Sequence, residues 1–544
     1  MTCRHVNAVA TTSDSASKTS LGADHFDYSV RHSTKPTRAA VSSIPEACLS
    51  GVSTMATATA SAPSSTSYRQ LYIDGQWTDG TGGKRLAVTN PATEETIAEV
   101  AFGTREDCKK AIAAAHRALP GWAKLTAWDR AKVLKKTAEL MRERADLLAR
   151  TMTMEQGKPL VEAKAEVMHS ADTFEWFAEE GKRAYGQVIP NSVPGKRHLT
   201  IKHPVGVVGA IGPWNFPITL QARKIAPALA AGCTIVSKPA SQTPLSLVNV
   251  FDCLIDAGLP KGVANLVIGP AREIADEFLE NRDVRKISFT GSTEVGKQLM
   301  RAAAGQVKRL SLELGGHAPF IVFPDADPEA VAKAAVIGKF RNNGQVCISP
   351  SRFFVHKDVH TKFTDVAVDA AKKLKVGNGL EPGIEVGPMF ERKAMENTIG
   401  LVQDAAAKGA KILTGGKRDD RFEKGYFFQP TILTGLTPDA KMLNDEPFAP
   451  VMPVLDFSKI DDVIAAANNT VYGLAAYVFT NDLTVMWKMA EGLEAGIIGM
   501  NDPVPATPQC PFGGMKESGL GRELAHEGLE AYLETKYVSI KLRE

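Results

Sequence analysis

Short apolar runs alternate with stretches of helical period along the middle of the chain, and this alternation limits the possible fold more than any other feature. The run VGVVGAI at 205–211 is typical of a buried strand, and the residues after it repeat their apolar positions at helical spacing. Strands are predicted at 205–211, 233–236, 264–268 and 286–289, and helices at 219–231 and 244–257. This order predicts an α/β fold with a parallel, doubly wound sheet.

A second series of the same kind begins near residue 318 and predicts a second α/β domain. It consists of strands at 318–323 and 352–355 and helices at 328–340 and 361–374. Before the first series, residues 104–184 are predicted to be mostly helical, with a capping box of Thr104 and Asp107 and an interruption at Pro120–Gly121. A short strand that turns at Asp74–Gly75 precedes these helices, and the alternation of residues 532–542 predicts a final strand.

The composition excludes several classes of protein. Lysine and arginine number 64 against 61 acids, a net charge of +3, and no basic stripe of the kind that binds nucleic acid is present. No run approaches the roughly 18 apolar residues of a membrane span. Seven single cysteines, without a CxxC or HExxH motif, indicate neither a disulfide framework nor a metal site. We therefore expect a soluble, cytoplasmic protein of several domains, with no metal and with neither nucleic acid nor a membrane as partner.

The first 70 residues differ from the rest, because they are rich in Ser, Thr and Ala and poor in large apolar residues. Such a composition cannot bury enough apolar surface to offset the entropy of ordering, so residues 1–70 are predicted to be a disordered extension. The slight excess of basic residues resembles an organellar transit peptide, which would imply a mitochondrial protein, but four acids argue against it. Alternatively, the protein begins at Met55.

A glycine-rich segment, GSTEVGK at 291–297, follows the predicted strand at 286–289. Its spacing is similar to a phosphate-binding loop, but Gln298 stands where such a loop needs Ser or Thr to hold magnesium, and the GxGxxG pattern is missing as well. What remains is a turn between a strand and a helix, whose N–H groups can bind an anion. The alternative is a glycine-rich turn without a ligand.

Three further positions carry side chains suited to chemistry. Cys347 lies among polar residues in FRNNGQVC, and such surroundings favour a nucleophile with a lowered pKa over a core cysteine. Glu313 stands between leucines before a double glycine, which suits a desolvated general base; the alternative is a salt-bridged acid at a strand end. Asn215 lies in PWNFP at 213–217, whose prolines and aromatic residues hold its amide rigidly, either to stabilise an oxyanion or simply as part of a packed loop. Ordinary buried cysteines are expected at Cys108, Cys233, Cys253 and Cys510.

Taken together and in order, these segments resemble the aldehyde dehydrogenase superfamily. The blocks are PWNFP at 213–217, KPA at 238–240, FTGSTEVG at 289–296, LELGG at 312–316, GQVC at 344–347, EPF at 446–448 and PFGG at 511–514. The resemblance runs from about Leu71 to the C-terminus. It implies an NAD(P)-binding domain at 71–184 and 205–315, a catalytic domain at 316–505, and an oligomerisation region at 185–204 together with the C-terminal segment 506–544. It also implies a homodimer or homotetramer in which the C-terminal strand extends a partner's sheet.

The resemblance also implies a mechanism. Cys347 attacks an aldehyde carbon as a thiolate, Asn215 and the Cys347 N–H hold the oxyanion, hydride passes to NADP or NAD, and Glu313 activates the water that hydrolyses the thioester to a free acid. Cofactor contacts are implied for Trp214, Lys238, Gly291, Ser292, Glu446 and Phe448. Many relatives that prefer NAD carry Glu where this chain has Ser241, so NADP is expected to be accepted without excluding NAD.

Two arginines suggest the substrate. Arg223 and Arg341 match positions at which the branch acting on succinate semialdehyde binds the substrate carboxylate. The resemblance therefore implies oxidation of succinate semialdehyde to succinate, with Thr507 in the segment that lines the entrance. The chain departs from that branch within 501–507 and at Ser349, where a second cysteine is common, so a local disulfide switch is not expected.

Several alternatives stay open at this point. Glutarate semialdehyde or a keto-acid semialdehyde would satisfy the same two arginines. If the arginines form only structural salt bridges, the substrate is a different, uncharged aldehyde. A cysteine-dependent ester or thioester hydrolase using Cys347 with Glu313 is a further alternative, and so is a non-enzymatic binding role.

Overall fold

The computed structural model describes residues 67–543, and the disorder predicted for residues 1–66 lies outside them. For residues 67–70 that prediction is wrong, because Ser67–Arg69 form strand β1, which pairs in parallel with β5 (Thr96–Ala101). Side chains anchor this strand. The Tyr68 hydroxyl donates to Asp79 at 2.6 Å, and Arg69 forms an ion pair with Asp252 at 2.5 Å.

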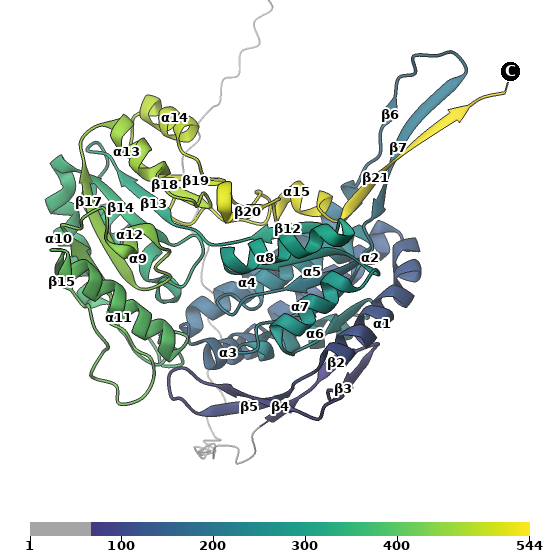
Figure 1. Cartoon of the computed structure of the whole chain (residues 1–544), viewed down its shortest axis with the longest axis horizontal. Helices are drawn as coiled ribbons and strands as arrows, with labels where there is room; N and C mark the ends of the chain where they lie inside the picture. The colour runs from purple at the N-terminus through teal and green to yellow at the C-terminus, as the bar shows by residue number, and fades with distance from the viewer. Residues whose placement is uncertain (1–66, 544) are drawn as a thin grey trace, which may run out of the picture. The chain divides into compact units, whose positions relative to one another are not determined.

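The first half of the described chain supplies seven strands of an eight-stranded sheet, and the late strand β20 supplies the eighth, in the order β20-β12-β11-β8-β9-β10-β2-β3 (Figure 1). Its five central strands are parallel, and the pairings beyond them at both edges are antiparallel. The strands are β2 (Leu71–Ile73), β3 (Gln76–Thr78), β8 (Val207–Ile211), β9 (Thr234–Lys238), β10 (Ala264–Leu266), β11 (Val284–Thr290), β12 (Arg309–Glu313) and β20 (Gly519–Leu520). The predicted α/β fold is confirmed.

Helices cover both faces of this sheet. Successive buried side chains of β8 point to opposite faces, and each face packs against its own set of helices. Val207 and Ile211 share a hydrophobic cluster with α1, α7 and α8, whereas Val208 and Ala210 share one with α2 to α6. The helices are α1 (Arg105–Lys124), α2 (Ala127–Glu143), α3 (Ala145–Gln156), α4 (Leu160–Glu180), α5 (Thr219–Ala231), α6 (Pro244–Asp256), α7 (Ala271–Glu280) and α8 (Thr293–Ala303). The sheet is therefore doubly wound.

The predicted interruption of the first helix at Pro120–Gly121 is wrong. Helix α1 continues to Lys124 with Pro120 inside it, although its start is capped as predicted by Thr104 and Asp107. Proline removes one N–H bond and crowds the preceding turn, which costs about 3 kcal/mol but does not by itself end a helix whose other side packs well. The next turn is fixed by Trp122, which is buried and donates its Nε1–H to the Leu229 carbonyl at 3.1 Å.

A second sheet of seven strands has the order β15-β16-β17-β14-β13-β18-β19, and all of its pairings are parallel except that of β15. The strands are β13 (Ala318–Val322), β14 (Pro350–His356), β15 (Lys411–Thr414), β16 (Thr431–Thr434), β17 (Val451–Phe457), β18 (Ala475–Phe479) and β19 (Ile497–Met500). Helices again cover both faces: Phe320 clusters with α9 (Pro328–Phe340) and α10 (Lys357–Lys373), and Ile321 clusters with α13 (Ile460–Asn468) and α14 (Leu483–Gly492).

Smaller elements complete the fold. Helices α11 (Arg392–Ala407) and α12 (Lys441–Asn444) flank the second sheet, and α15 (Ala525–Glu530) precedes the last strand. Strand β4 (Arg85–Thr89) pairs with β5 in a small third sheet.

The two large sheets meet where β12 ends at Glu313 and β13 begins at Ala318. Strand β20 later returns to the first sheet and pairs antiparallel with the end of β12. Strand β20, which belongs to the C-terminal segment but precedes the final strand of the chain, therefore lies against Glu313. The domain boundaries inferred from the sequence stay a prediction.

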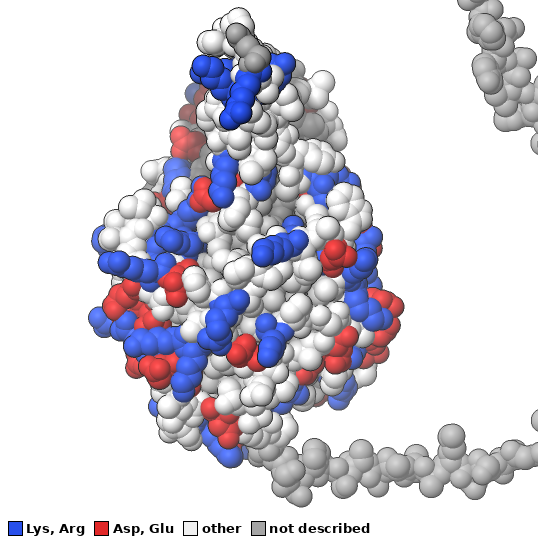
Figure 2. Space-filling view, turned by 90° about the vertical axis from the view of Figure 1, so that its right-hand side faces the viewer, with Lys and Arg blue, Asp and Glu red and all other residues white. Residues whose placement is uncertain are grey.

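A three-stranded antiparallel sheet, β21-β7-β6, projects from the first half of the chain (Figure 1). It consists of β6 (Val188–Ile189), β7 (Lys196–Pro204) and β21 (Leu533–Lys541). Most side chains of β21 are exposed, and Figure 2 shows lysine and arginine side chains gathered at the projecting end. The strand predicted at the end of the chain is confirmed.

Candidate active site

Cys347 lies in the loop between helix α9 and strand β14. Residues 342–344, which are Asn, Asn and Gly, have φ angles of 46°, 58° and 71°, a region that Asn and Gly tolerate better than other residues. The chain then turns, and the Ser349 N–H donates to the Val346 carbonyl at 2.9 Å. This turn presents the Cys347 side chain, which is half-buried.

Glu313 ends strand β12, and the double glycine after it allows the chain to pass against the Cys347 loop. A Cβ atom on Gly316 would lie 2.4 Å from the Cys347 carbonyl oxygen, and one on Gly315 would lie 2.7 Å from Glu446 Oε2. Larger residues would push these segments apart, because interiors are already close-packed. The Glu313 side chain is buried, and neither carboxyl oxygen meets hydrogen-bond geometry with any of residues 67–543.

Asn215 follows strand β8 and precedes helix α5. Its Nδ2 atom donates one hydrogen to the Gln345 carbonyl at 3.1 Å, which leaves its second amide hydrogen for another acceptor. In the part of the chain that the structure describes, the Cys347 N–H donates to no backbone carbonyl. Two donors are therefore available close to the thiol.

Two cavities meet at Cys347, and only Cys347 and Leu220 line both. The arginine cavity, of about 240 Å³, also contains Arg223 and Arg341. Its other walls are Glu162, Ala165, Glu166, His169, Phe216, Thr219, Val346, Ile348, Val504, Ala506 and Phe512. The carboxyl cavity, of about 210 Å³, contains Glu313 and Glu446. Its other walls are Pro213, Trp214, Asn215, Thr290, Gly291, Ser292, Leu314, Gly315 and Phe448.

The guanidinium groups of the arginine cavity make no ion pair within residues 67–543. Arg223 is buried, lies 4.0 Å over the Phe512 ring, and has an Nε atom without a hydrogen-bond partner in that range. Arg341 lies 5.4 Å over the Phe216 ring. Burial and the two arginines lower the pKa of His169 to about 4, so this ring is neutral at pH 7. The cavity thus holds two guanidinium groups that form no ion pair with the described residues, and the Glu162 carboxyl lies on the same wall.

The carboxyl cavity has the opposite character. Burial raises the pKa of Glu313 to about 7 and that of Glu446 to about 8. Burial and the neighbouring Glu313 carboxyl also raise the pKa of the Cys347 thiol. The expectation of a lowered cysteine pKa is therefore wrong for this structure, because the polar residues beside Cys347 in sequence do not offset burial and a nearby carboxyl group.

A buried ion pair lies behind Glu313. Lys224 Nζ contacts Glu523 Oε1 at 2.6 Å and the Thr290 hydroxyl at 2.7 Å. Glu523 contributes to the raised pKa of Glu313, whereas Lys224 acts to lower it. Lys224 and Glu523 were not identified from the sequence because they lie 299 positions apart.

Most of the residues expected to contact a cofactor lie around the carboxyl cavity. Trp214 stacks on Phe390 with ring centroids 3.9 Å apart and meets Phe448 edge-on at 5.7 Å. Ser292 caps helix α8 by accepting from the Val295 N–H, and Gly291 and Ser292 at the start of this helix line the cavity. Glu446 accepts a hydrogen bond from the Gly316 N–H at 3.1 Å.

Three expected site residues line neither cavity. Lys238 is buried at the end of β9, where its ammonium donates to the Pro239 carbonyl at 2.9 Å. Ser241 lines a separate cavity of about 360 Å³ that it shares with Glu155. Thr507 is half-buried near Ala506, and its hydroxyl has no hydrogen-bond partner among the described residues.

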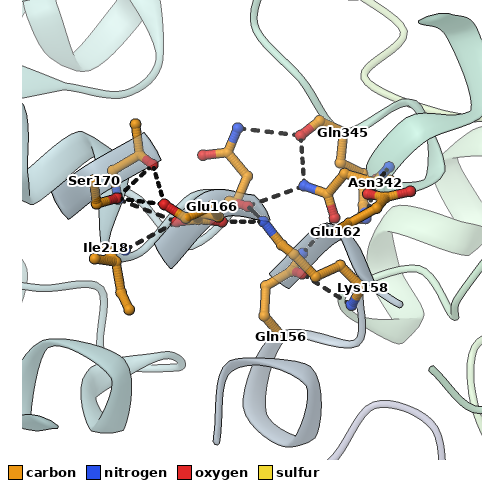
Figure 3. A network of polar contacts seen from close by, with 10 residues as sticks. Gln156, Lys158, Glu162, Glu166, Ser170, Ile218, Asn342 and Gln345 are labelled. Carbon is orange, nitrogen blue, oxygen red and sulfur yellow. Dashed lines mark hydrogen bonds and ion pairs between the residues drawn. The ribbon is translucent and has the colours of Figure 1, made fainter. Parts of the chain in front are cut away.

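Sequence reasoning missed the contribution of helix α4. Glu162, Glu166 and His169 share one face of this helix and line the arginine cavity. Figure 3 shows Glu166 in a network of polar contacts with Lys158 and Asn342. Acidic residues repeated at helical spacing, in a helix that also carries Phe174 and Phe177, were the available signal.

The cysteine expectations hold in part. Cys108, Cys233 and Cys253 are buried, but Cys510 is exposed, because it follows Pro508 in an irregular surface loop and not in a helix or strand. Within residues 67–543, no group of three His, Cys, Asp or Glu side chains is arranged to hold a metal ion. No helix in the same range is long and apolar enough to cross a membrane.

Comparison with known proteins places this geometry in context. Residues 77–538 match a sequence model described as the Aldehyde dehydrogenase family. The chain is 47% identical to the succinate-semialdehyde dehydrogenase [NADP(+)] GabD of Escherichia coli and to the glutarate-semialdehyde dehydrogenase of Pseudomonas putida, covering 87% of this chain and 98% of each relative. A crystal structure of an E. coli NADP dependent enzyme matches with a TM-score of 0.86 at 47% identity, over 87% of this chain and 98% of that chain. A betaine aldehyde dehydrogenase of Staphylococcus aureus in complex with NAD+ matches with a TM-score of 0.85 at 38% identity, over 88% and 95%.

Proposed function

The chain belongs to the aldehyde dehydrogenase family, and from this premise we propose that it oxidises succinate semialdehyde to succinate with NADP+ or NAD+. The observation that carries the substrate assignment is the arginine cavity. Two guanidinium groups without ion-pair partners face the same space as the Cys347 thiol. A planar guanidinium binds a carboxylate through two parallel hydrogen bonds, so a short aldehyde with a carboxylate at its far end suits this cavity.

The residues present fit a nicotinamide dinucleotide. Trp214 and Phe448 offer apolar walls for a ring, and the start of helix α8 at Ser292 offers N–H groups for phosphate. Lys238 is a buried ammonium with donors to spare, which suits ribose hydroxyl groups. We assign Gly291 and Ser292 to the pyrophosphate and Glu446 to the nicotinamide ribose. When bound, the cofactor accepts the hydride that leaves the aldehyde carbon.

The first chemical step belongs to Cys347. Its thiol gives its proton to the Glu313 carboxylate, and the thiolate forms a bond to the aldehyde carbon. The resulting oxyanion accepts hydrogen bonds from the free Nδ2 hydrogen of Asn215 and from the Cys347 N–H. Loss of hydride converts this adduct into a thioester on Cys347.

The second step belongs to Glu313. After it has released its proton to water, its carboxylate takes a proton from a water molecule that attacks the thioester carbon. The bond to sulfur breaks, and the free acid leaves while Cys347 regains a proton. A pKa of about 7 suits this role, because the group is then a base of useful strength at neutral pH.

Glutarate semialdehyde is a second candidate substrate. The relative from Pseudomonas putida carries that name at the same identity as the succinate-semialdehyde relative. The two aldehydes differ by one methylene group, a difference that changes binding by about 1–3 kcal/mol. The two arginines suit both.

The cofactor and the assembly are also proposals. Ser241 carries no charge that would repel a 2′-phosphate, which supports NADP as the better cofactor.

Strand β21 is a long edge strand with exposed Tyr537 and Ile540, and such an edge favours pairing with a second copy. We infer a homodimer or homotetramer, which light scattering will test. We infer a cytoplasmic location, with the mitochondrion as the alternative if residues 1–66 act as a transit peptide.

One experiment tests the proposed function. The purified protein is mixed with succinate semialdehyde, glutarate semialdehyde or hexanal, each with NADP+ and with NAD+, and reduced nicotinamide is followed by absorbance. Both semialdehydes should exceed hexanal in kcat/KM by about tenfold or more, the worth of one charged hydrogen bond. The Cys347→Ala variant provides the blank. Preference for hexanal would contradict carboxylate binding. No reduction of nicotinamide with any aldehyde, together with hydrolysis of an added thioester, would indicate a hydrolase.

A further inference from the structure

The main-chain carbonyl of Asn215 accepts hydrogen bonds from two buried side chains. Lys158 Nζ donates to it at 2.8 Å, and Asn342 Nδ2 donates to it at 2.9 Å. Both donors come from other parts of the chain, since Lys158 precedes helix α4 and Asn342 lies in the Cys347 loop. The residue with the proposed oxyanion donor is thus held from two sides.

Lys158 is an unusual residue for its position. Its side chain is 0% exposed. Among the described residues, its ammonium has polar or cation–π contacts with Glu166 Oε2 at 2.5 Å, the Asn215 carbonyl and the face of the Phe216 ring at 3.8 Å. Burial lowers the pKa of this ammonium, and Glu166 opposes that shift. Burying an ion pair costs several kcal/mol per ion before attraction offsets it. A neutral apolar residue would fill the same space at a lower desolvation cost. Packing alone therefore does not explain a charged residue at this position.

Glu166 extends the contact to helix α5. Its Oε1 atom accepts hydrogen bonds from the N–H groups of Ile218 and Thr219, both at 3.1 Å (Figure 3). Helix α5 has no side-chain cap of its own at this end. One ion pair therefore holds both ends of the segment 215–219, at the Asn215 carbonyl and at the first turn of the helix.

Asn342 joins this segment to the nucleophile loop. Its Nδ2 atom bridges the carbonyls of Asn215 and Gln345, and the Asn215 amide donates to the same Gln345 carbonyl. The Asn342 side chain is itself fixed, because its Oδ1 atom accepts from Gln156 Nε2 at 3.0 Å (Figure 3). The direction of the Asn215 amide is therefore set relative to the loop that carries Cys347.

We propose that Lys158, together with Asn342, is a positioning residue that aims the Asn215 amide at the oxyanion; this inference rests on the proposed function. Neither residue touches the reacting atoms. A preorganised donor stabilises developing charge because it does not have to reorient during the reaction. Small displacements of such groups cost rate, about 10²-fold for 1 Å.

A double-mutant cycle tests this role. The variants are Lys158→Met, Asn215→Ala and the two combined, and the readout is the rate constant of the first burst of reduced nicotinamide at saturating semialdehyde. Asn215→Ala should slow the burst by about 10²–10³-fold, the usual cost of one oxyanion donor. Lys158→Met should slow it by about 10- to 100-fold with KM nearly unchanged. In the Asn215→Ala background the same change should cost less than about twofold, because coupled residues are not additive.

Controls keep a positioning role distinct from a folding role. Lys164→Met removes an exposed lysine of the following helix α4, paired with Asp146 at the surface, and should leave the burst unchanged. If Lys158→Met fails to fold, Asn342→Gly replaces it, since glycine keeps the positive φ angle and removes only the amide. Thermal unfolding of each variant shows whether it is folded.

The outcomes separate the two proposals. Equal loss in both backgrounds, a change confined to KM, or no loss in a folded variant would each overturn the positioning role. The proposed function fails independently if the unmodified enzyme oxidises no semialdehyde. An unchanged burst in Asn215→Ala would instead remove the oxyanion role of Asn215 and the positioning role with it.

Discussion

The arginine cavity and the carboxyl cavity share the Cys347 thiol but carry charge in different ways. Arg223 and Arg341 carry guanidinium groups, which stay protonated in proteins. Neither forms an ion pair within residues 67–543, although the Glu162 carboxyl lines the same cavity. Glu313 and Glu446 have pKa values of about 7 and 8, so their charge depends on conditions near neutrality. Permanent charge suits binding of an anion, whereas conditional charge suits movement of a proton. The difference predicts that changes on the two sides of Cys347 affect different kinetic constants.

The largest effect is expected from Glu313→Gln. Steady-state turnover should fall about 10²–10⁴-fold, the usual contribution of a general base. The first burst of reduced nicotinamide should slow as well, because Glu313 also accepts the proton of the Cys347 thiol. In the unmodified enzyme, turnover should rise as pH increases through about 7, because Glu313 works in its ionised form, and the variant should lack this rise. Stopped-flow absorbance measures both phases.

A matched control is Glu273→Gln, which changes an exposed acid on helix α7. An unchanged burst together with a loss of turnover would restrict Glu313 to the second step.

The Glu313→Gln variant should also be at least as stable as the unmodified enzyme at pH 8. Burial raises the Glu313 pKa in the folded protein, so ionisation above pH 4.5 favours the unfolded chain and stability falls as pH rises toward 7.

The arginines should act on KM. Arg223→Gln and Arg341→Gln are each expected to raise the KM for succinate semialdehyde about 10- to 100-fold, since a hydrogen bond to a charged group contributes about 1.5–3 kcal/mol. Hexanal, which has no carboxylate, should be oxidised as before. Initial rates over a range of aldehyde concentrations measure the change, with the exposed Arg282→Gln as control. An equal effect on hexanal would show that the arginines support the fold.

A smaller effect is expected on the cofactor side. Ser241→Glu should lower kcat/KM with NADP+ about tenfold, because a carboxylate repels the 2′-phosphate, and should change the value with NAD+ much less. Ser241→Gln supplies a neutral side chain of the same size. Similar losses with both cofactors in the two variants would mean that size, not charge, matters at this position.

The smallest effect concerns Glu162, the acid of the arginine cavity. Burial raises its pKa to about 6, against the opposing influence of Arg341 and Lys158. Above pH 6 its charge opposes an anionic substrate, so Glu162→Gln should lower the KM for succinate semialdehyde about threefold at pH 7.5. Below pH 6 the two proteins should agree, because Glu162 is then protonated. A raised KM at pH 7.5 would instead show that Glu162 orients Arg341.

Local signals explain why much of the fold could be predicted. Helix α9 has the predicted bounds, because Asp327 caps it and Pro328 begins it. Both sheets follow from runs of buried residues separated by helices. Pro120 misled the prediction, since helix α1 continues through it to Lys124, where Trp122 is buried.

Residues of the site could be predicted from the sequence only where a short segment around them carries a distinctive pattern. Cys347, Glu313 and Asn215 stand in distinctive short segments, and the structure brings them to one cavity. Lys158 and Glu166 carry no such signal, because their partners at Asn215 and Ile218 are about fifty residues away. The raised pKa of Cys347 depends on burial, which sequence neighbours do not reveal.

The two cavities have separate walls apart from Cys347 and Leu220. Evolution can therefore alter the choice of aldehyde through helix α4 or the segment at 504–512 while hydride transfer is left intact. Leu220 is the exception, because a change in the size of its side chain alters the shape of both cavities at once. Because Leu220 is not itself reactive, it can be substituted, and each substitution changes the substrate range and the cofactor chemistry together.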